Sequence, residues 1–272
     1  MIQSETTGNG TDIEVRGLIL DMDGVLWRAE TPIGDLPEIF DQFERRNWRV
    51  VLATNNATRS PDQYLDKLAG YGVKRLERWQ IVNSAMAASH YLKQRHPKGG
   101  KVYVIGQDGL FDALTEQGFL PSEDDDVLAV VVGMDRGITY HKLSHATLLI
   151  RAGTPFIGTN PDRTFPTPEG LTPGTGAILA AIEAATDVPP KILGKPGPAM
   201  YSLAMERLNT QPHQTVAVGD RLETDIAGAQ KLGCLSAVVL SGVSTPDEIQ
   251  SWQPAPNYVA DDLTDLLSKL PA

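Results

Sequence analysis

Short apolar segments alternate with helical segments along nearly the whole chain of 272 residues, and this alternation constrains the fold most strongly. The segments predicted as strands are 15–20, 49–53, 80–82, 101–105, 127–132, 155–158, 191–193, 215–218 and 237–240. The segments predicted as helices are 36–46, 61–70, 84–96, 110–117, 140–152, 175–185, 198–208, 224–232 and 263–270. Strands that alternate with helices form parallel sheets with helices on both faces. The sequence therefore predicts an α/β fold.

Two short breaks divide this pattern. Pro97-Lys98-Gly99-Gly100 has the composition of a linker, and Pro189-Pro190 marks a second boundary. Between them, the prolines of segment 159–173 argue against regular structure there. A chain of this length fits one large domain or two smaller ones. We predict two units, the first formed by 1–97 together with 190–272 and the second by the insert 98–189.

Charge and cysteine content narrow the range of partners and compartments. The chain has 24 basic and 34 acidic residues, which give a net charge of −10 at pH 7. Because an acidic surface repels phosphate backbones and anionic lipids, we expect neither nucleic acid nor a membrane as a partner. Cys234 is the only cysteine, so an internal disulfide is excluded, and we expect a buried thiol in a reducing compartment. With no signal-peptide pattern and no membrane-length apolar run, we expect a cytoplasmic protein.

Polar side chains follow four of the predicted strands. Asp21 and Asp23 end the first strand in Asp21-Met22-Asp23-Gly24, where two like charges repel each other unless a cation or a reacting group lies nearby. Ligands of open α/β sheets bind outside the carboxyl ends of the strands. We therefore expect this pair to meet the other clusters in one site; these are Thr54-Asn55-Asn56, Lys195 in Gly194-Lys195-Pro196, and Asp220 with Asp225 in 219–225.

The carboxylates of these clusters suit phosphoryl transfer with Mg²⁺. Asp21 and Asp220 offer hard oxygen ligands, the backbone carbonyl of Asp23 offers another, and Asp225 is expected to orient the waters around the metal. Asp21 can also attack phosphorus to form an aspartyl-phosphate. Asp23 can give a proton to the leaving oxygen and then take one from the attacking water. The carboxylates therefore predict both a metal site and a nucleophile.

The remaining side chains suit the phosphate group itself. The hydroxyl of Thr54 and the amides of Asn55 and Asn56 can donate to phosphate oxygens, and Lys195 offers a positive charge that offsets the nucleophile and the phosphate. Each cluster also has a plainer interpretation, as turn-forming polar residues or, for Lys195, as a solvated loop lysine. Trp27 likewise has two interpretations, because it either packs beside this site or fills the core.

The quoted motifs resemble those of a known superfamily. Asp-x-Asp-Gly-Val at 21–25, Thr-Asn-Asn at 54–56, Gly-Lys-Pro at 194–196 and Gly-Asp-Arg-Leu-x-Thr-Asp-Ile at 219–226 are similar to the four motifs of the haloacid dehalogenase (HAD) superfamily. The chain most resembles subclass IIA, which groups NagD-like, p-nitrophenyl and phosphoglycolate phosphatases. The resemblance implies a Rossmann-like parallel-sheet core with an inserted α/β cap of the C2 type at 98–189. It leaves open a homodimer formed through the cap.

The expected function is Mg²⁺-dependent hydrolysis of small phosphomonoesters, such as phosphoglycolate, nucleoside monophosphates, sugar phosphates or p-nitrophenyl phosphate. Two alternatives stay open, namely a phospho-accepting signalling domain and a catalytically silent scaffold with this fold. The resemblance implies that loop 160–166, which contains Arg163 and Phe165, faces the phosphate site and selects the substrate. Because some pyridoxal phosphate-hydrolysing relatives have a histidine where this chain has Phe165, that substrate is disfavoured. The sequence does not identify the substrate.

Overall fold

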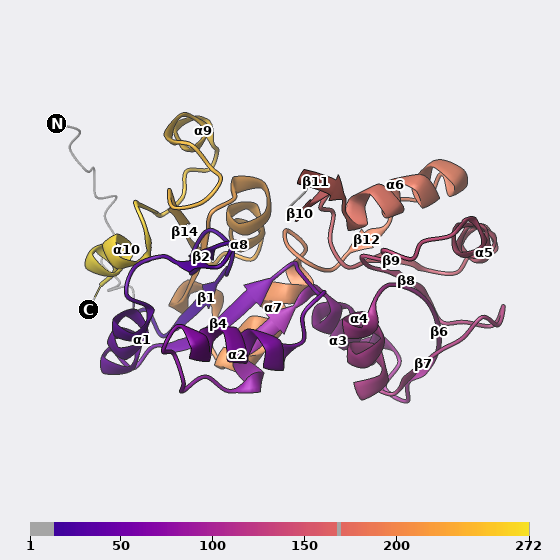
Figure 1. Ribbon diagram of the computed structural model, residues 1–272, viewed down its shortest axis with the longest axis horizontal. Helices are drawn as coiled ribbons and strands as arrows, with labels where there is room; N and C mark the ends of the chain where they lie inside the picture. The colour runs from indigo at the N-terminus through magenta and orange to yellow at the C-terminus, as the bar shows by residue number, and fades with distance from the viewer. Residues whose placement is uncertain (1–13, 168–169, 272) are drawn as a thin grey trace.

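In the computed structural model, which describes residues 14–167 and 170–271, six parallel strands form the larger sheet (Figure 1). Their order is β15-β14-β13-β1-β4-β5. Leu18 of β1 lies opposite Val50 of β4 on one side and Val216 of β13 on the other. The bounds are β1 (Gly17–Leu20), β4 (Arg49–Thr54), β5 (Ile81–Asn83), β13 (Thr215–Gly219), β14 (Leu235–Val239) and β15 (Tyr258–Ala260).

Helices cover both faces of this sheet. Leu18 and Leu20 face one core with α1, α2 and α10, whereas Ile19 between them faces another core with α3, α7 and α8. A strand that is buried on both faces shows a continuous apolar run instead of an alternating one, as β1 does. The α-helices of the described residues, including those of the second sheet, are α1 (Leu36–Arg45), α2 (Pro61–Gly70), α3 (Ser84–Arg95), α4 (Asp108–Glu116), α5 (Tyr140–Arg151), α6 (Thr175–Thr186), α7 (Pro198–Leu208), α8 (Ala227–Lys231), α9 (Pro246–Ser251) and α10 (Leu263–Lys269).

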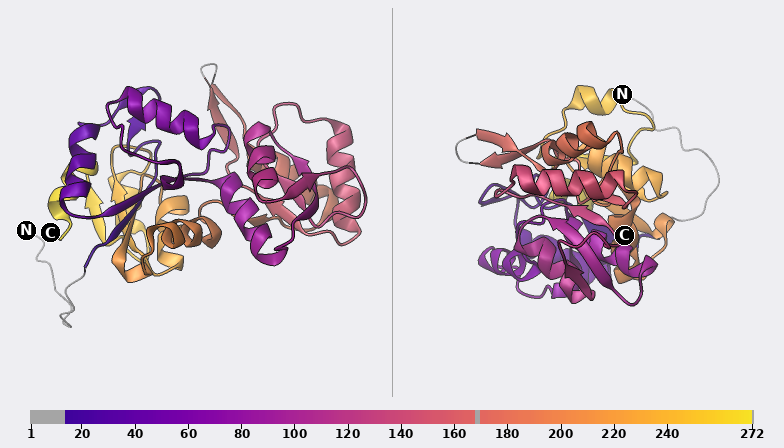
Figure 2. Two further views of the ribbon diagram at one scale, coloured as in Figure 1. Left: turned by 90° about the horizontal axis from the view of Figure 1, so that it is seen from below. Right: turned by 90° about the vertical axis from the view of Figure 1, so that its right-hand side faces the viewer.

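A second parallel sheet forms a separate lobe, which lies beside the first along the longest axis of the molecule (Figures 1 and 2). Its strand order is β12-β9-β8-β6-β7. Helices α3 and α4 cover one face, and α5 and α6 cover the other. The expected α/β class is thus confirmed, while the proposed domain limits remain a prediction. The bounds are β6 (Gly100–Ile105), β7 (Phe119–Pro121), β8 (Val130–Val132), β9 (Phe156–Gly158) and β12 (Lys191–Ile192).

Two expectations for this second lobe were wrong. The strand expected at 191–193 was predicted to resume the first sheet, yet β12 pairs with β9 and extends the second sheet. So short an apolar run does not specify which sheet it joins. The segment 159–173 contains regular structure, because β10 (Thr164–Thr167) pairs antiparallel with β11 (Gly170–Pro173). Both strands of a two-stranded hairpin are edge strands, where proline is tolerated.

Smaller elements complete the description. A short hairpin of β2 (Trp27–Arg28) and β3 (Thr31–Pro32) follows Asp23. A π-helix over Leu222–Ile226 leads into α8, where a single α-helix was expected. Within the part of the chain that the structure describes, no helix combines the length and apolar character needed to cross a bilayer.

Candidate active site

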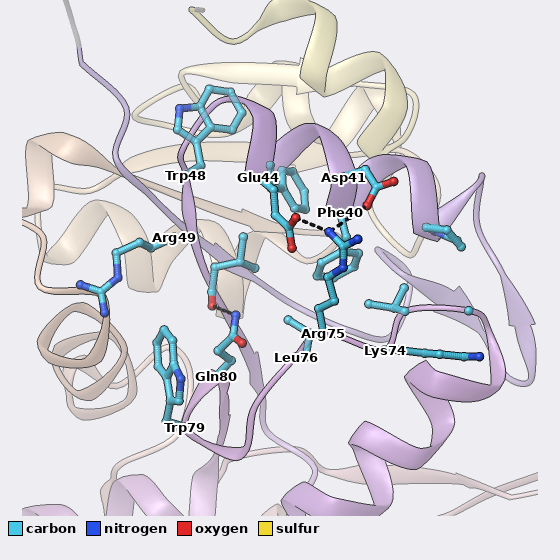
Figure 3. A pocket seen from close by; sticks show the side chains of 15 residues that line it. Phe40, Asp41, Glu44, Trp48, Arg49, Lys74, Arg75, Leu76, Trp79 and Gln80 are labelled. Atoms are coloured by element: carbon cyan, nitrogen blue, oxygen red, sulfur yellow. Dashed lines mark hydrogen bonds and ion pairs between the residues drawn. The ribbon is translucent and has the colours of Figure 1, made fainter.

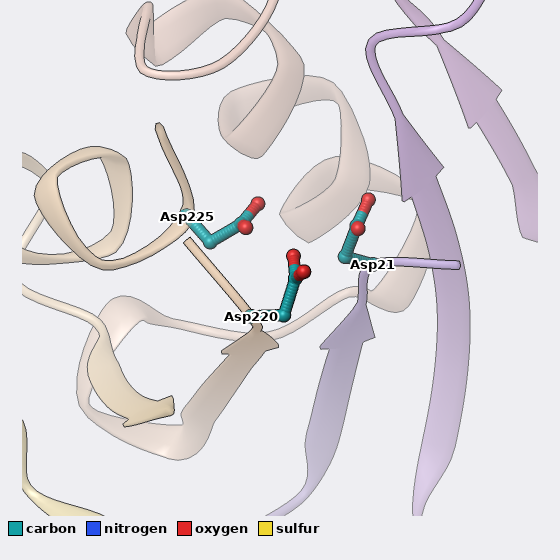
Figure 4. A group of neighbouring side chains, drawn as sticks. All are labelled: Asp21, Asp220 and Asp225. Carbon is teal, nitrogen blue, oxygen red and sulfur yellow. The ribbon is translucent and has the colours of Figure 1, made fainter. Parts of the chain in front are cut away.

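Three neighbouring strands of the larger sheet end at one edge in polar side chains. Asp21 follows β1, Thr54 ends β4, and Asp220 follows β13. These strands lie side by side in the order β13-β1-β4, and the Asp21 N–H donates to Val218 O at 2.9 Å. The carboxylates of Asp21, Asp220 and Asp225 gather at this edge (Figure 4). As expected, these motif residues lie close together at the carboxyl ends of adjacent strands.

A cavity of about 490 Å³ lies at the opposite edge of the same sheet (Figure 3). Its lining includes Trp48, Trp79 and Arg49, and Arg49 is the first residue of β4, whereas Thr54 is the last. The carboxylates thus lie outside this cavity. Because ligands of α/β sheets bind at the carboxyl ends of the strands, the chemistry is expected at the Thr54 end.

Lys195 places a buried positive charge among the carboxylates. Its side chain is only 5% exposed, and its Nζ lies 2.5 Å from Asp21 Oδ1 and 2.7 Å from Asp225 Oδ1. The Nζ also donates to the backbone carbonyl of Ala53 at 3.0 Å. Burial lowers the pKa of Lys195, but the negative charges of Asp21 and Asp225 outweigh it and raise the pKa well above its usual value. Lys195 is therefore a charged member of the site, and its interpretation as a solvated loop lysine is excluded.

The three carboxylates form a group that fits a divalent cation. Asp21, Asp220 and Asp225 each offer an oxygen, and these oxygens lie within 4.8 Å of one another. Asp220 Oδ1 is buried and accepts no hydrogen bond from the described residues, while Oδ2 accepts one from the Val243 N–H at 3.0 Å. Burial and the charge of Asp225 raise the pKa of Asp220 to about 6. Burial also raises the pKa of Asp21 well above its usual value, although Lys195 opposes the shift.

This orphaned oxygen and the crowded negative charge are what a bound cation relieves. The donor set here consists of hard carboxylate oxygens, which divalent cations such as Mg²⁺ prefer. The structure brings Asp225 into the group, whereas the side chain of Asp23 lies outside it. A divalent-metal site is consistent with these residues, and the assignment of individual ligands stays a prediction.

Gly24 explains why a glycine follows the aspartate pair. Its φ is +83°, a conformation that residues with a side chain rarely adopt. A Cβ atom added there would lie 2.3 Å from Asp220 Oδ2. The glycine therefore lets the chain turn away from β1 while the carboxylate of Asp220 approaches the backbone.

Asn55 links three segments of the site through hydrogen bonds. Its side-chain Oδ1 accepts from the Lys195 N–H at 2.7 Å, and its Nδ2 donates to Lys195 O at 3.0 Å. Its backbone carbonyl accepts from Ser84 Oγ at 2.7 Å and from Asn160 Nδ2 at 3.0 Å. The side chain of Asn55 is thus occupied in holding the Lys195 loop. Its expected role in phosphate binding stays a prediction that now falls on its backbone N–H.

Thr54 and Asn56 build the turn around Asn55. Thr54 is buried, and its Oγ1 accepts from the Asn56 N–H at 3.1 Å. The side chain of Asn56 accepts from the Thr58 N–H at 3.0 Å. These bonds are typical of polar turns, so the turn interpretation holds for Thr54 and Asn56. Their expected role in phosphate binding stays a prediction.

The loop after β9 brings the second lobe against the edge of the larger sheet where the three carboxylates gather. Asn160 is buried and contacts Asn55, as described above. Asp162 is half-buried, and its N–H donates to Asn160 Oδ1 at 3.1 Å. Burial raises the pKa of the Asp162 carboxyl, although the charges of Arg221 and Lys195 oppose the shift. The sequence prediction included Asn160 and Asp162 in loop 160–166 but singled out Arg163, which is exposed, and not these two residues. Their position directly after a strand was the available signal.

Phe165, the other loop residue that the sequence singled out, lies on the hairpin strand β10. It is half-buried, and the guanidinium of Arg136 lies 5.3 Å from the centre of its ring. Its expected part in substrate selection stays a prediction.

Two family models match this chain. A haloacid dehalogenase-like hydrolase model matches residues 18–120, and a HAD-hydrolase-like model matches residues 192–266. An acid sugar phosphatase of Staphylococcus aureus (strain USA300) is 34% identical over 257 residues, which cover 94% of this chain and 98% of that protein. The chain belongs to the haloacid dehalogenase-like hydrolase family.

Solved structures refine this assignment to subclass IIA. A p-nitrophenyl phosphatase from Archaeoglobus fulgidus has a TM-score of 0.87 at 29% identity and covers 94% of this chain and 100% of that one. NagD from E. coli K-12 has a TM-score of 0.86 at 29% identity and covers 93% of this chain and 98% of that one. The expected enzyme class, a hydrolase of phosphoric monoesters, is confirmed.

Proposed function

We propose that this protein hydrolyses the phosphate esters of small metabolites with Mg²⁺, through a phosphoryl group carried by Asp21. The observation that carries the proposal is the contact of Lys195 Nζ with Asp21 Oδ1 at 2.5 Å, inside a group that includes Asp220. A fixed positive charge beside Asp21 favours its ionised, nucleophilic form and attracts a phosphate dianion. Because the chain as a whole carries a net charge of −10, this local positive charge is the natural anchor for a phosphate.

The reaction needs two steps. First, a carboxylate oxygen of Asp21 attacks phosphorus, the ester bond between phosphorus and oxygen breaks, and Asp23 gives a proton to the leaving oxygen. Second, Asp23 takes a proton from water as that water attacks phosphorus, and the bond to Asp21 breaks to release phosphate. Asp23 therefore alternates between acid and base and ends each cycle as it began.

The surrounding groups hold the phosphate. Thr54 Oγ1, the backbone amides of Asn55 and Asn56, and the ammonium of Lys195 are the expected donors to its oxygens. Asp21 and Asp220 with the backbone carbonyl of Asp23 would hold Mg²⁺, and Asp225 would act from just outside this set. The cation supplies positive charge next to the phosphate when it is bound.

For the substrate class, we infer small, hydroxyl-rich phosphate esters such as sugar phosphates. The half-buried Asp162 supports this inference, because it lies in the loop that contacts Asn55 through Asn160, and its N–H donates to Asn160 Oδ1 at 3.1 Å. A carboxylate there accepts hydrogen bonds from hydroxyl groups and repels a second acid such as that of phosphoglycolate. The name of the Staphylococcus relative, acid sugar phosphatase, agrees with this preference.

The test is a panel of phosphorylated metabolites and p-nitrophenyl phosphate, assayed for released phosphate with purified protein and Mg²⁺. Asp21→Asn, purified in the same way, controls for contaminating phosphatases. We expect turnover of sugar phosphates above phosphoglycolate, and none in the variant. Equal release by the variant and the natural protein would refute the proposed chemistry, whereas a reversed order of substrates would refute only the substrate class.

A further inference from the structure

Trp27 combines deep burial with a single polar contact to a proposed catalytic group. Its side chain is 1% exposed, and its Nε1–H donates to Asp23 Oδ1 at 2.8 Å. Asp23 itself is exposed at the start of the turn that follows β1. An exposed carboxylate without such a bond would turn freely among its rotamers. The indole is therefore a rigid donor beside a side chain that otherwise has little to hold it.

The backbone between these residues brings the indole back over Asp23. The N–H groups of Leu26 and Trp27 both point to Met22 O, at 2.8 and 3.3 Å, and the Gly24 N–H donates to Trp27 O at 2.8 Å. This tight turn pairs Asp23 with Trp27 in an isolated β-bridge. The position of the indole thus follows from the local turn.

Packing then fixes the orientation of the ring. Trp27 belongs to the same core as Met22 and Leu26. Lys67 Nζ lies 4.4 Å from the centre of the indole, and the ring of Tyr71 lies 6.1 Å away. Because Lys67 also donates to Ala29 O at 2.8 Å, the cation stays in place over the ring. The indole cannot follow Asp23 if Asp23 moves, so the hydrogen bond constrains the carboxylate.

We propose that Trp27 is a positioning residue that selects which oxygen of Asp23 carries the proton. With Oδ1 held by the indole N–H, Oδ2 is left to give the proton to the leaving oxygen and to take one from water. The inference rests on the proposed acid–base role of Asp23. Trp27 thus combines both interpretations that its sequence position suggested, because its rings fill the core and its Nε1–H acts on the site.

The effect of such positioning depends on how much the leaving group needs the proton. Phenolate is a stronger base than p-nitrophenolate, so phenyl phosphate needs protonation of its leaving oxygen more than p-nitrophenyl phosphate does, although the two substrates have nearly the same shape. The ratio of their kcat/KM values therefore reports proton donation and is insensitive to general loss of structure. Removing a hydrogen bond to a charged group should change this ratio by about tenfold or more.

The test compares the ratio in Trp27→Phe, Asp23→Asn, the double variant and Trp48→Phe. Trp48 is the matched control, because it is a buried tryptophan of the same core at the opposite end of the sheet. We expect Trp27→Phe to lower the rate on phenyl phosphate about tenfold more than that on p-nitrophenyl phosphate. Trp48→Phe should leave the ratio unchanged, and Trp27→Phe should have no further effect on the ratio in the Asp23→Asn background.

Each outcome separates the two proposals. An unchanged ratio in Trp27→Phe together with an altered ratio in Asp23→Asn would overturn the role of Trp27 alone. An unchanged ratio in Asp23→Asn would overturn the acid role of Asp23 and, with it, the inference. If Trp27→Phe fails to fold, benzothienylalanine at position 27 keeps the two fused rings and lacks the N–H, and the same ratio decides.

Discussion

The ammonium of Lys195 lies 2.5 Å from the carboxylate of Asp21, although 174 positions of the sequence separate them. The backbone of Lys195 is held at both its N–H and its carbonyl by the side chain of Asn55. The location of the positive charge thus depends on a turn at the end of β4. This relationship makes Asn55 a structural determinant of the chemistry at Asp21.

Asn55→Ala should lower kcat by about 10- to 100-fold, because Lys195 loses two hydrogen bonds that fix its backbone and its ammonium no longer has one position. The measurement is steady-state kinetics on p-nitrophenyl phosphate at saturating Mg²⁺. Asn257→Ala is the control, since Asn257 also bonds a backbone N–H, that of Ser236, but lies away from the site. A kcat within twofold of the natural protein in Asn55→Ala would contradict this dependence.

Metal binding should depend on pH. The pKa of Asp220 is raised to about 6 in the folded, metal-free protein, above its usual value of 3.8. The stability that protonation contributes is therefore present at low pH and is lost as the pH rises through about 6. Mg²⁺ binds the carboxylate form and should restore stability there. We expect Mg²⁺ to raise the melting temperature more at about pH 7.5 than at about pH 5, measured against EDTA.

Asp220→Asn isolates the contribution of this carboxylate. An amide does not titrate, so the difference between the two pH values should shrink in the variant. A Mg²⁺-induced shift that is equal at both pH values in the natural protein would argue against carboxylate ligands with raised pKa values.

Asp162→Asn should change substrate preference more than it changes the rate on p-nitrophenyl phosphate. Loss of the charge near the leaving group should raise kcat/KM for phosphoglycolate relative to glucose 6-phosphate by about tenfold. Asp126→Asn is the control, because Asp126 is an exposed acid of the same lobe that pairs with Lys101 at 3.2 Å. An unchanged preference in Asp162→Asn would show that Asp162 does not select the substrate, and Arg163 and Phe165 would stay the candidates.

The thiol of Cys234 should be unreactive in the native protein. Cys234 is 5% exposed, and burial raises its pKa from 9.0 to about 11. This shift lowers the thiolate fraction about 100-fold near pH 8, and burial excludes the reagent as well. Labelling with a thiol reagent should therefore be fast in denaturant and slow without it. Rapid labelling of the folded protein would show that the region around Cys234 opens readily.

Much of the site could be predicted because its chemistry lies at strand ends that the sequence marks clearly. Asp21 and Asp220 each follow an apolar run, and parallel strands bring such ends together. The position of Lys195 was less secure from its local sequence, since β12 before it joins the other sheet. Its Gly-Lys-Pro motif carried information that strand patterns did not.

Contacts between side chains from distant or turning segments could not be predicted. Nothing in the sequence around Asn55 says that its side chain holds Lys195 instead of a phosphate, because an amide NH₂ can donate to a backbone carbonyl or to a phosphate oxygen. The bond from Trp27 to Asp23 depends on the path of a tight turn, which periodicity does not report. The hairpin of β10 and β11 was missed because proline content was taken to exclude strands, whereas edge strands accept it.

The central claim is that Asp21 carries the phosphoryl group. The most direct measurement is mass spectrometry of peptides from acid-quenched turnover of p-nitrophenyl phosphate, with Asp23→Asn included because loss of the base should slow the second step and let the intermediate accumulate. We predict one phosphoryl group on the peptide that contains Asp21, located on that side chain by fragmentation. A phosphoryl group on any other residue, or undiminished turnover by Asp21→Asn, would contradict the claim.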